Sequence, residues 1–220
     1  MEYLVTGIDI EENTNVFYFS HELAPSGYLW IFSKGKNRAN IGIGIRGDYS
    51  SEGHRAKDYL DAFIQKNCPD GKILEVISGG VPITRPLTET YGENLLIAGD
   101  AAHVSDPMTG GGIYQALYTG RLAGKTAAEA IHTGDTSKTA LAVYDAGWRN
   151  SRFGWNLRLS HAGSEFYNRL SDEQLNNILG EFPDCQIDNI SLITLLKAFV
   201  KNNPKLLLQL PGLAKVLISK

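Results

Sequence analysis

The residues best suited to do chemistry lie at positions 94–113, which read NLLIAGDAAHVSDPMTGGGI. A short apolar run ends there in Gly99 and Asp100, and a proline-containing loop then leads to three consecutive glycines. A carboxylate at the carboxyl end of a strand can accept hydrogen bonds from the hydroxyl groups of a bound ligand. Glycines at a helix start expose backbone N–H groups, which favour an anion and let a flat ring approach closely. The pattern indicates a site for a planar, partly anionic ligand that carries hydroxyl groups.

Both strands and helices are predicted to position this segment. Runs rich in β-branched and aromatic residues, together with one short apolar run expected to be a buried strand, predict strands over residues 3–10, 16–22, 28–33, 38–46, 73–77 and 95–98. Apolar periodicity predicts helices over residues 54–67, from Gly110 to about 133, and through most of the last third. The last third is expected to contain one long or kinked helix, and Ser171 with Gln174 reads as the start of another.

The helix predicted after Gly110 has an unusual face. Glycine or alanine recurs at every fourth residue from Gly112 to Ala128, which forms one smooth ridge. Glycine inside a helix costs about 1 kcal/mol relative to alanine, so its repetition predicts close approach of a backbone, a sheet or a ligand.

Composition excludes several classes of protein. The 220 residues are 43% apolar and 20% charged with a net charge of −3, which is typical of a globular protein of one or two domains and offers no field for nucleic acid. Two cysteines form no disulfide framework and suit a reducing cytoplasm. No apolar run reaches about 18 residues, and the N-terminus lacks a signal-peptide pattern. The five histidines have no ligand-like spacing, so no metal site is expected.

Residues 42–47 match the pattern G-x-G-x-x-G, but a dinucleotide fingerprint needs those glycines between a strand and a helix. They fall here inside a predicted strand, and we interpret them as a strand and a turn. The predicted strand alternates isoleucine with Asn40, Gly42 and Gly44, so one of its faces carries almost no side chain and something is expected to pack closely on it.

Residues 99–112 resemble the flavin-binding motif G-D-A-A-H-x-x-x-P-x-x-G-x-G of the flavoprotein hydroxylase superfamily. The variant P-x-T-G-G-G-I at residues 107–113 looks more like the geranylgeranyl reductase family. Two further segments agree: residues 27–35 resemble that family's G-Y-x-W-x-F-P-K-G, with Ser33 where proline is usual, and residues 38–44 resemble its A-N-V-G-x-G strand. The resemblance spans residues 3 to about 169.

The resemblance implies an FAD-binding site and a lipid site. Asp100 would hydrogen-bond the ribityl chain, and the glycine-rich helix start would face the pyrimidine end of the flavin. The implied cofactor-binding residues are Gly99, Asp100, Pro107, Gly110, Gly111, Gly112 and Ile113. Tyr28, Trp30 and Phe32 share one strand face by their period of two, and they would line a cavity for an isoprenoid chain. A sheet core is the alternative for these three aromatic residues.

The implied fold is the C-terminal half of an α/β FAD-dependent oxidoreductase, which in isolation would be α+β. Residues 1–83 would form a mixed or antiparallel substrate-domain sheet with one helix, residues 84–134 would complete the FAD-binding domain, and residues 135–220 would be helical. The implied reaction saturates carbon–carbon double bonds of geranylgeranyl chains in lipids or their precursors. It needs an external electron donor and an N-terminal Rossmann half, for which these residues carry no fingerprint. No proton donor is assigned.

Two other functions stay open at this stage. A flavin-dependent hydroxylase or halogenase would keep the cofactor and change the reaction, although the G-Y-x-W-x-F segment favours the reductase. A chain that binds little without a partner half would be no enzyme by itself.

Three features have both a functional and an ordinary interpretation. Arg85 would help neutralise the reduced flavin or the pyrophosphate, or would form a surface salt bridge. His103 would contact the flavin or the substrate, but a structural role is favoured. Residues 191–220 are rich in leucine and lysine and lack acidic residues, so they would rest on an anionic membrane surface from the cytoplasmic side or pack as ordinary core.

Overall fold

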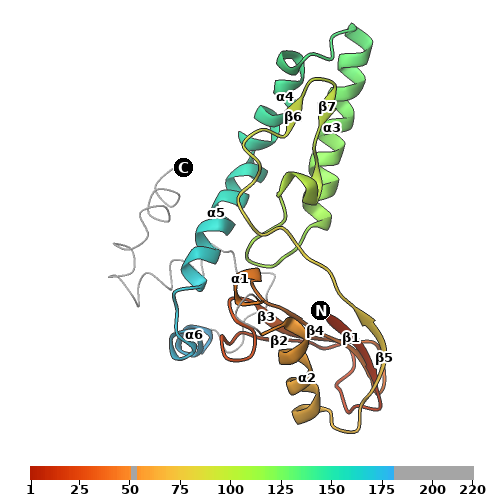
Figure 1. The fold of residues 1–220 in the computed structure, drawn as a ribbon, viewed down its shortest axis with the longest axis vertical. Coiled ribbons are helices and arrows are strands. Elements are labelled where there is room, and N and C mark those ends of the chain that lie inside the picture. The colour runs from red at the N-terminus through yellow and green to blue at the C-terminus, as the bar shows by residue number, and fades with distance from the viewer. Residues whose placement is uncertain (51–53, 181–220) are drawn as a thin grey trace. The chain divides into compact units, whose positions relative to one another are not determined.

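The computed structural model describes residues 1–50 and 54–180 (Figure 1). The C-terminal segment 191–220, for which membrane contact and core packing are the two alternatives, lies outside the described residues. The chain divides into two compact units. One contains residues 1–80 and, of the described chain, residues 168–180, and we call it the sheet unit. The other contains residues 81–167, and we call it the helical unit.

The sheet unit is built on one antiparallel sheet with the strand order β2-β3-β4-β1-β5. Its strands are β1 (Glu2–Thr6), β2 (Asn15–Tyr18), β3 (Tyr28–Ser33), β4 (Arg38–Gly44) and β5 (Lys72–Ile77). Its helices are α1 (Gly47–Ser50), α2 (Ala56–Asn67) and α6 (Asp172–Leu179). The sheet, for which a mixed or antiparallel arrangement is predicted, is antiparallel, and α2 is the helix predicted over residues 54–67.

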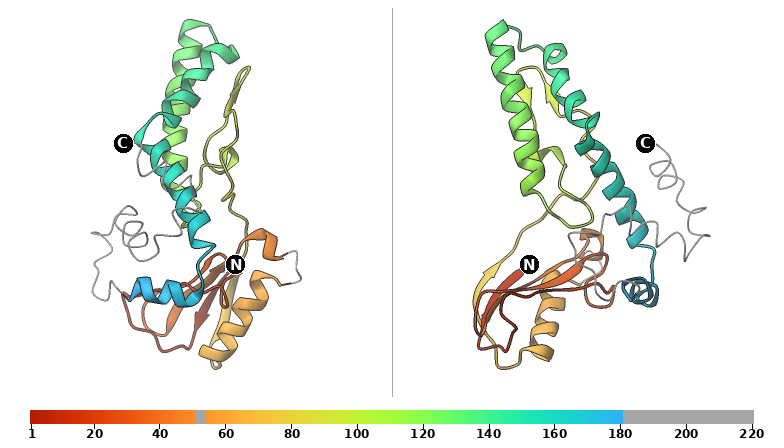
Figure 2. Two further views of the ribbon diagram at one scale, coloured as in Figure 1. Left: turned by 90° about the vertical axis from the view of Figure 1, so that its left-hand side faces the viewer. Right: turned by 180° about the vertical axis from the view of Figure 1, so that it is seen from behind.

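Helix α2 packs against one face of this sheet (Figure 2). Its buried residues Leu60, Phe63 and Ile64 meet alternate side chains of the central strands, including Ile41 and Ile43. The isoleucine face predicted for residues 38–46 is therefore the face that forms the core. The side chains that alternate with these core residues along each strand lie on the opposite face of the sheet.

Three predicted strands of this sheet end earlier than expected, β4 only slightly, at Gly44, and β1 and β2 by more. Strand β1 ends at Thr6 because Gly7 adopts a positive φ of 76° and turns the chain. Strand β2 ends at Tyr18, after which Asp172 of α6 accepts hydrogen bonds from the Ser20 hydroxyl at 2.6 Å and the His21 amide at 2.7 Å. The turn chemistry of these loops therefore overrides the apolar pattern that continues beyond each strand.

The helical unit contains the β6–β7 ribbon and three long helices. Its elements are β6 (Tyr91–Gly92), β7 (Leu95–Leu96), the 3-10 turn η1 (Gly99–Ala102), α3 (Ile113–Thr133), α4 (Lys138–Arg149) and α5 (Arg152–Tyr167). The expectation of a fully buried strand over residues 95–98 is wrong, since only two residues pair and Leu95 is 50% exposed. Strand β7 has one neighbour, β6, and this two-stranded ribbon offers no second face to bury it.

The long or kinked helix predicted in the last third is two helices, α4 and α5. The chain breaks at Asn150 and Ser151, where a β-carbon on Gly154 would lie 2.4 Å from the carbonyl oxygen of Arg149. Glycine is therefore required where the two helices meet. The capping box predicted at Ser171 is confirmed, because the Ser171 and Gln174 side chains each accept the other residue's amide.

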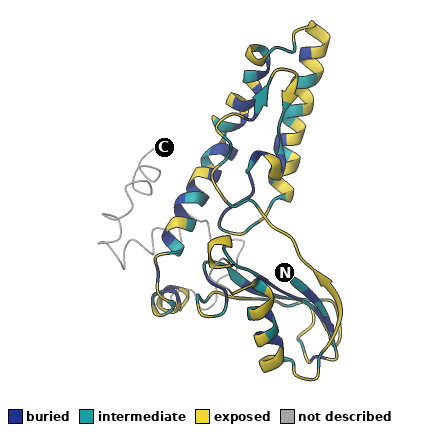
Figure 3. Ribbon diagram, viewed as in Figure 1, coloured by how far each residue is buried: buried dark blue, intermediate teal, exposed yellow. Residues whose placement is uncertain are grey.

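Beyond its first turn, the small-residue ridge of α3 has open space at both of its glycines. Gly120 and Gly124 have no neighbouring atom within 4 Å of an added β-carbon, and one side of α3 is largely exposed along its length (Figure 3). Large apolar side chains flank the ridge and are also exposed: Ile113 by 82%, Leu117 by 69% and Ile131 by 72%. The sheet or ligand expected on this face is not among the described residues.

None of the helices in residues 1–50 and 54–180 combines the length and the apolar character needed to cross a bilayer.

Candidate functional site

The residues predicted to bind the cofactor meet at the turn between β7 and α3. Gly99 has a positive φ of 62°, and its amide donates to the buried hydroxyl of Thr119 at 3.0 Å. An added β-carbon at Gly99 would lie 3.2 Å from that of Ala116. The strand end thus packs directly on α3, which brings Asp100 beside the first turn of that helix.

Asp100 is exposed and lies next to Gly112, the N-cap of α3. A β-carbon on Gly112 would be 2.9 Å from Oδ1 of Asp100. The same oxygen accepts a hydrogen bond from the buried Ser105 hydroxyl at 2.6 Å, which fixes the carboxylate. The helix start has no side-chain cap and no acidic residue in its first turn. Its first backbone N–H groups are therefore available to an acceptor from outside the helix.

The glycines 110–112 form the approach to α3 and are not helical, because α3 begins at Ile113. Gly110 has a positive φ of 69° and open space where a β-carbon would be, and Gly111 is exposed. Pro107 is buried in the same loop. A flat group can therefore approach the backbone at Gly110 without meeting a side chain there.

Asp106 holds the loop in shape, and sequence reasoning did not identify it. Its Oδ1 accepts from the amides of Met108 at 2.9 Å and Thr109 at 3.0 Å, and its Oδ2 accepts from the Ser160 hydroxyl of α5 at 2.7 Å. Its own amide donates to the carbonyl oxygen of Gly111 at 2.8 Å. An aspartate that bonds the backbone two residues on is typical of a turn, and this was the available signal.

His103 and Arg85 have structural contacts. His103 adopts a positive φ of 56°, and its Nδ1 shares a hydrogen bond of 2.9 Å with the Thr84 hydroxyl. Arg85 forms an ion pair of 3.0 Å with Glu165, and its side chain is 80% exposed. Such a surface pair adds little to stability. Burial and the nearby positive charge of Arg85 lower the pKa of His161, which lies on α5 as Glu165 does.

A second buried polar network supports the strand that leads into the turn. The Thr90 hydroxyl donates to Asp145 at 2.6 Å, and the Trp148 indole donates to that hydroxyl at 3.1 Å. Arg149 donates to the other oxygen of Asp145 at 2.5 Å and also to the Leu87 carbonyl. Burial opposes ionisation of Asp145, but the hydrogen bonds from Arg149 and Thr90 outweigh it and lower its pKa. Trp148 is therefore part of the packing between α4 and its neighbours.

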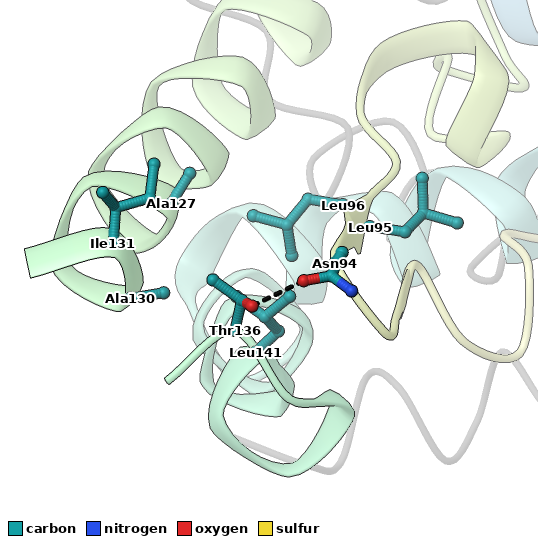
Figure 4. Close-up of a pocket in the computed structure, with 8 residues that line it drawn as sticks. All are labelled: Asn94, Leu95, Leu96, Ala127, Ala130, Ile131, Thr136 and Leu141. Carbon is teal, nitrogen blue, oxygen red and sulfur yellow. Dashed lines mark hydrogen bonds between the residues drawn. The ribbon is translucent and has the colours of Figure 1, made fainter. Parts of the chain in front are cut away.

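A cavity of about 190 Å³ lies elsewhere in the helical unit (Figure 4). It is lined by Asn94, Leu95, Leu96, Ala127, Ala130, Ile131, Thr136 and Leu141, and one hydrogen bond of 2.5 Å joins Thr136 to Asn94. Ala127 lies about 21 Å along α3 from Ile113, at 1.5 Å per residue. This cavity is therefore remote from the turn at Asp100.

The predicted substrate residues lie on the sheet face opposite α2. This face carries five aromatic side chains, which we call the aromatic face: Phe17, Phe19, Tyr28, Trp30 and Phe32. Neighbouring rings have centroids 5.5–6.4 Å apart. Phe17 is 40% and Phe19 38% exposed, whereas Leu29 on the other face is fully buried. Tyr28, Trp30 and Phe32 are half-buried, so they are not part of the core on the α2 side.

No group of three or more His, Cys, Asp or Glu side chains within residues 1–50 and 54–180 could hold a metal ion. The donors at the turn are instead a carboxylate and backbone amides, which suit an organic ligand with hydroxyl groups and a planar ring.

Comparison with known proteins agrees with this chemistry. Residues 1–81 match the family model "Geranylgeranyl reductase catalytic domain". The chain is 49% identical over 216 residues to a digeranylgeranylglycerophospholipid reductase of Methanoculleus marisnigri, covering 98% of this chain and 54% of the relative. A protein of the same name from Methanosphaerula palustris is 48% identical, with 96% and 53% covered.

A solved structure agrees with the fold. The crystal structure of a geranylgeranyl bacteriochlorophyll reductase-like protein from Thermoplasma acidophilum matches with a TM-score of 0.85 and 29% identity, over 96% of this chain and 53% of that one. The chain thus spans about half the length of the curated relatives that it matches. Over nearly all of its residues the chain is similar to proteins of the geranylgeranyl reductase family, and residues 1–81 match that family's catalytic-domain model.

Proposed function

We propose that this chain supplies the flavin-end contacts and the substrate face of an FAD-dependent reductase. The reaction is saturation of carbon–carbon double bonds in geranylgeranyl chains of glycerophospholipids or their precursors. The observation that carries the proposal is the exposed Asp100 carboxylate, fixed by Ser105 beside the uncapped start of α3. The names of the relatives support the substrate class.

The residues at the turn fit the flavin end of FAD. Asp100 would accept hydrogen bonds from ribityl hydroxyls, because Oδ1 already has one donor and Oδ2 accepts no hydrogen bond from the described residues. The backbone of Gly110, Gly111 and Gly112 would lie along the ring, with Ile113 beginning the helix. The first N–H groups of α3 would stabilise negative charge on the ring. When bound and reduced by an external electron donor, FAD supplies hydride chemistry to a double bond.

The aromatic face would hold the isoprenoid chain. Half-exposed aromatic rings offer a large apolar contact area at little cost in side-chain freedom. The geranylgeranyl chain is apolar and methyl-branched, so rings spaced by 5.5–6.4 Å along the sheet provide a continuous surface for it. Tyr28, Trp30 and Phe32 are the side chains that we assign to this contact.

The remaining length of the relatives would supply the Rossmann half. The exposed apolar face of α3, with Ile113, Leu117 and Ile131 each more than half exposed, supports a large apolar partner surface there. A lipid substrate also implies contact with a membrane surface from the cytoplasmic side.

Flavin binding tests the proposal. A chimera would join the unmatched part of the Methanoculleus marisnigri relative upstream of this chain, and its FAD content would be compared with that of its Asp100→Ala variant. We expect a yellow chimera and a loss of affinity of about tenfold or more in the variant, since a hydrogen bond to a charged group is removed. Asp70→Ala, which removes an aspartate from the sheet unit, is the control. Equal flavin content in all three proteins would contradict the assignment.

A further inference from the structure

The indole of Trp30 lies across a strand that has no side chain at that point. In the sheet register Trp30 of β3 is opposite Gly42 of β4, and Gly42 is opposite Glu2 of β1. A β-carbon on Gly42 would be 2.2 Å from Cζ2 and 2.3 Å from Cε2 of the indole. The ring therefore occupies the space above Gly42, and its N–H edge points toward β1.

Glu2 receives the edge of that ring. The Trp30 Nε1–H donates to Oε2 of Glu2 at 2.8 Å, and the Asn40 side-chain amide donates to Oε1 at 2.9 Å. A carboxylate with a donor on each oxygen is held in one orientation, and charge-assisted hydrogen bonds are among the stronger ones in proteins. Three strands thus combine to fix one indole.

We infer that Glu2 is a positioning residue, which holds the Trp30 ring flat on the aromatic face so that an isoprenoid chain can lie along it. The inference rests on the proposed function for its ligand and names the residue that prepares the binding surface. Glu2 itself touches Trp30 and Asn40.

The physical reason is preorganisation. A tryptophan side chain that is half-exposed can adopt several rotamers. A ligand that requires one rotamer binds more weakly when the side chain also populates the others. The bonds to Glu2 and the missing side chain at Gly42 select a flat ring before the ligand arrives. A ring in another rotamer would stand up from the sheet and interrupt the surface between Tyr28 and Phe32.

The test uses the full 220-residue chain and nitrogen–proton correlation spectra of its tryptophan indoles. The chain has three tryptophans, and the Trp30→Phe variant identifies the Trp30 resonance by its loss. In the wild type we expect a slowly exchanging Trp30 indole N–H, magnetisation transfer between the ring and the Gly42 α-protons, and a shift of this resonance on adding geranylgeraniol.

Glu2→Ala should remove the slow exchange and the contact to Gly42, and should weaken geranylgeraniol binding about tenfold, as expected for one charge-assisted hydrogen bond. Glu2→Thr also removes the carboxylate, but it introduces a residue that favours strands. This variant therefore provides the test if the alanine variant unfolds. Glu2→Gln keeps an acceptor for the indole and should retain both readouts. Glu12→Ala, which removes an exposed glutamate in the same unit, should change neither.

Ring contacts and affinity at wild-type values in Glu2→Ala or Glu2→Thr would overturn the inference. So would loss of the ring contacts without any loss of affinity. A wild-type chain in which geranylgeraniol shifts no resonance of the aromatic face would instead contradict the proposed substrate class. The two failures are read from different samples and are therefore distinguishable.

Discussion

Oδ1 of Asp100 lies 2.9 Å from the position that a β-carbon would take on Gly112. The carboxylate therefore occupies the place that any side chain at the helix start would need. Because the obstacle is the end of a rotatable side chain, Gly112→Ala should displace the carboxylate and leave the fold intact. This relationship separates an effect on the cofactor from an effect on stability.

We expect Gly112→Ala to change the free energy of unfolding by less than about 1 kcal/mol, and to lower the FAD affinity of the chimera by about tenfold. Denaturant unfolding and a flavin titration measure the two quantities. Gly120→Ala on the exposed ridge of α3, where nothing lies within 4 Å, is the matched control for stability in the 220-residue chain. A variant with unchanged flavin affinity would show that Asp100 is not a flavin ligand.

Gly42→Ala should destabilise the sheet unit by about 1–3 kcal/mol, the usual cost of forcing an atom into occupied space. The added methyl would overlap the Trp30 indole, which is tied to Glu2 and cannot move without breaking that bond. Gly44→Ala is two residues further on the same strand and would place its methyl 3.9 Å from the same ring. Urea unfolding measures the free energy of unfolding of both variants. An equal decrease in the two would contradict the described position of the Trp30 ring.

Arg149→Leu should destabilise the helical unit by about 2–4 kcal/mol. The substitution leaves the buried carboxylate of Asp145 without its cation and the Leu87 carbonyl without its donor. Arg152→Leu removes an exposed arginine three residues away and should cost no more than about 0.5 kcal/mol. Thermal unfolding followed by circular dichroism measures both. A loss in Arg152→Leu as large as that in Arg149→Leu would contradict the network.

The same network predicts a dependence of stability on pH. The folded pKa of Asp145 lies below its ordinary value of 3.8, so its ionised form stabilises the fold above that value. The stabilisation is lost as the pH falls through the folded pKa. Asp145→Asn should therefore cost more stability at pH about 7 than at pH about 3. Urea titrations of wild type and variant at the two pH values test this, and an equal difference at both would refute it.

The local sequence pattern predicted most helices and strands, because residue type and spacing decide where they form. Strand β3 and the helix cap at Ser171 follow from residue type and spacing alone, and both occur where predicted. The ends of β1 and β2 could not be placed from the pattern. They depend on the positive φ of Gly7 and on Asp172, which reaches back to the His21 loop from 151 positions later in the chain.

The site shows the same division. The positions of Asp100 and the glycines follow from a contiguous motif, whereas the fixing of Asp100 by Ser105 and of the loop by Asp106 needed the structure. The bond from Trp30 to Glu2 joins residues on two strands that are separated by a third, and their spacing of 28 residues carries no periodic signal. The small-residue ridge on α3 could be predicted from its period of four residues. Its exposure could not, because a covered and an uncovered helix show the same pattern.

Turnover by the chimera tests the central claim most directly. The chimera would be incubated without oxygen with a digeranylgeranylglycerophospholipid and dithionite as electron donor, and the lipid products would be analysed by mass spectrometry. The account predicts products that gain two hydrogen atoms for each double bond reduced, and less of these products from Asp100→Ala when FAD is limiting. A flavin-loaded chimera that leaves the lipid unchanged, or that adds oxygen to it in air, would contradict the account.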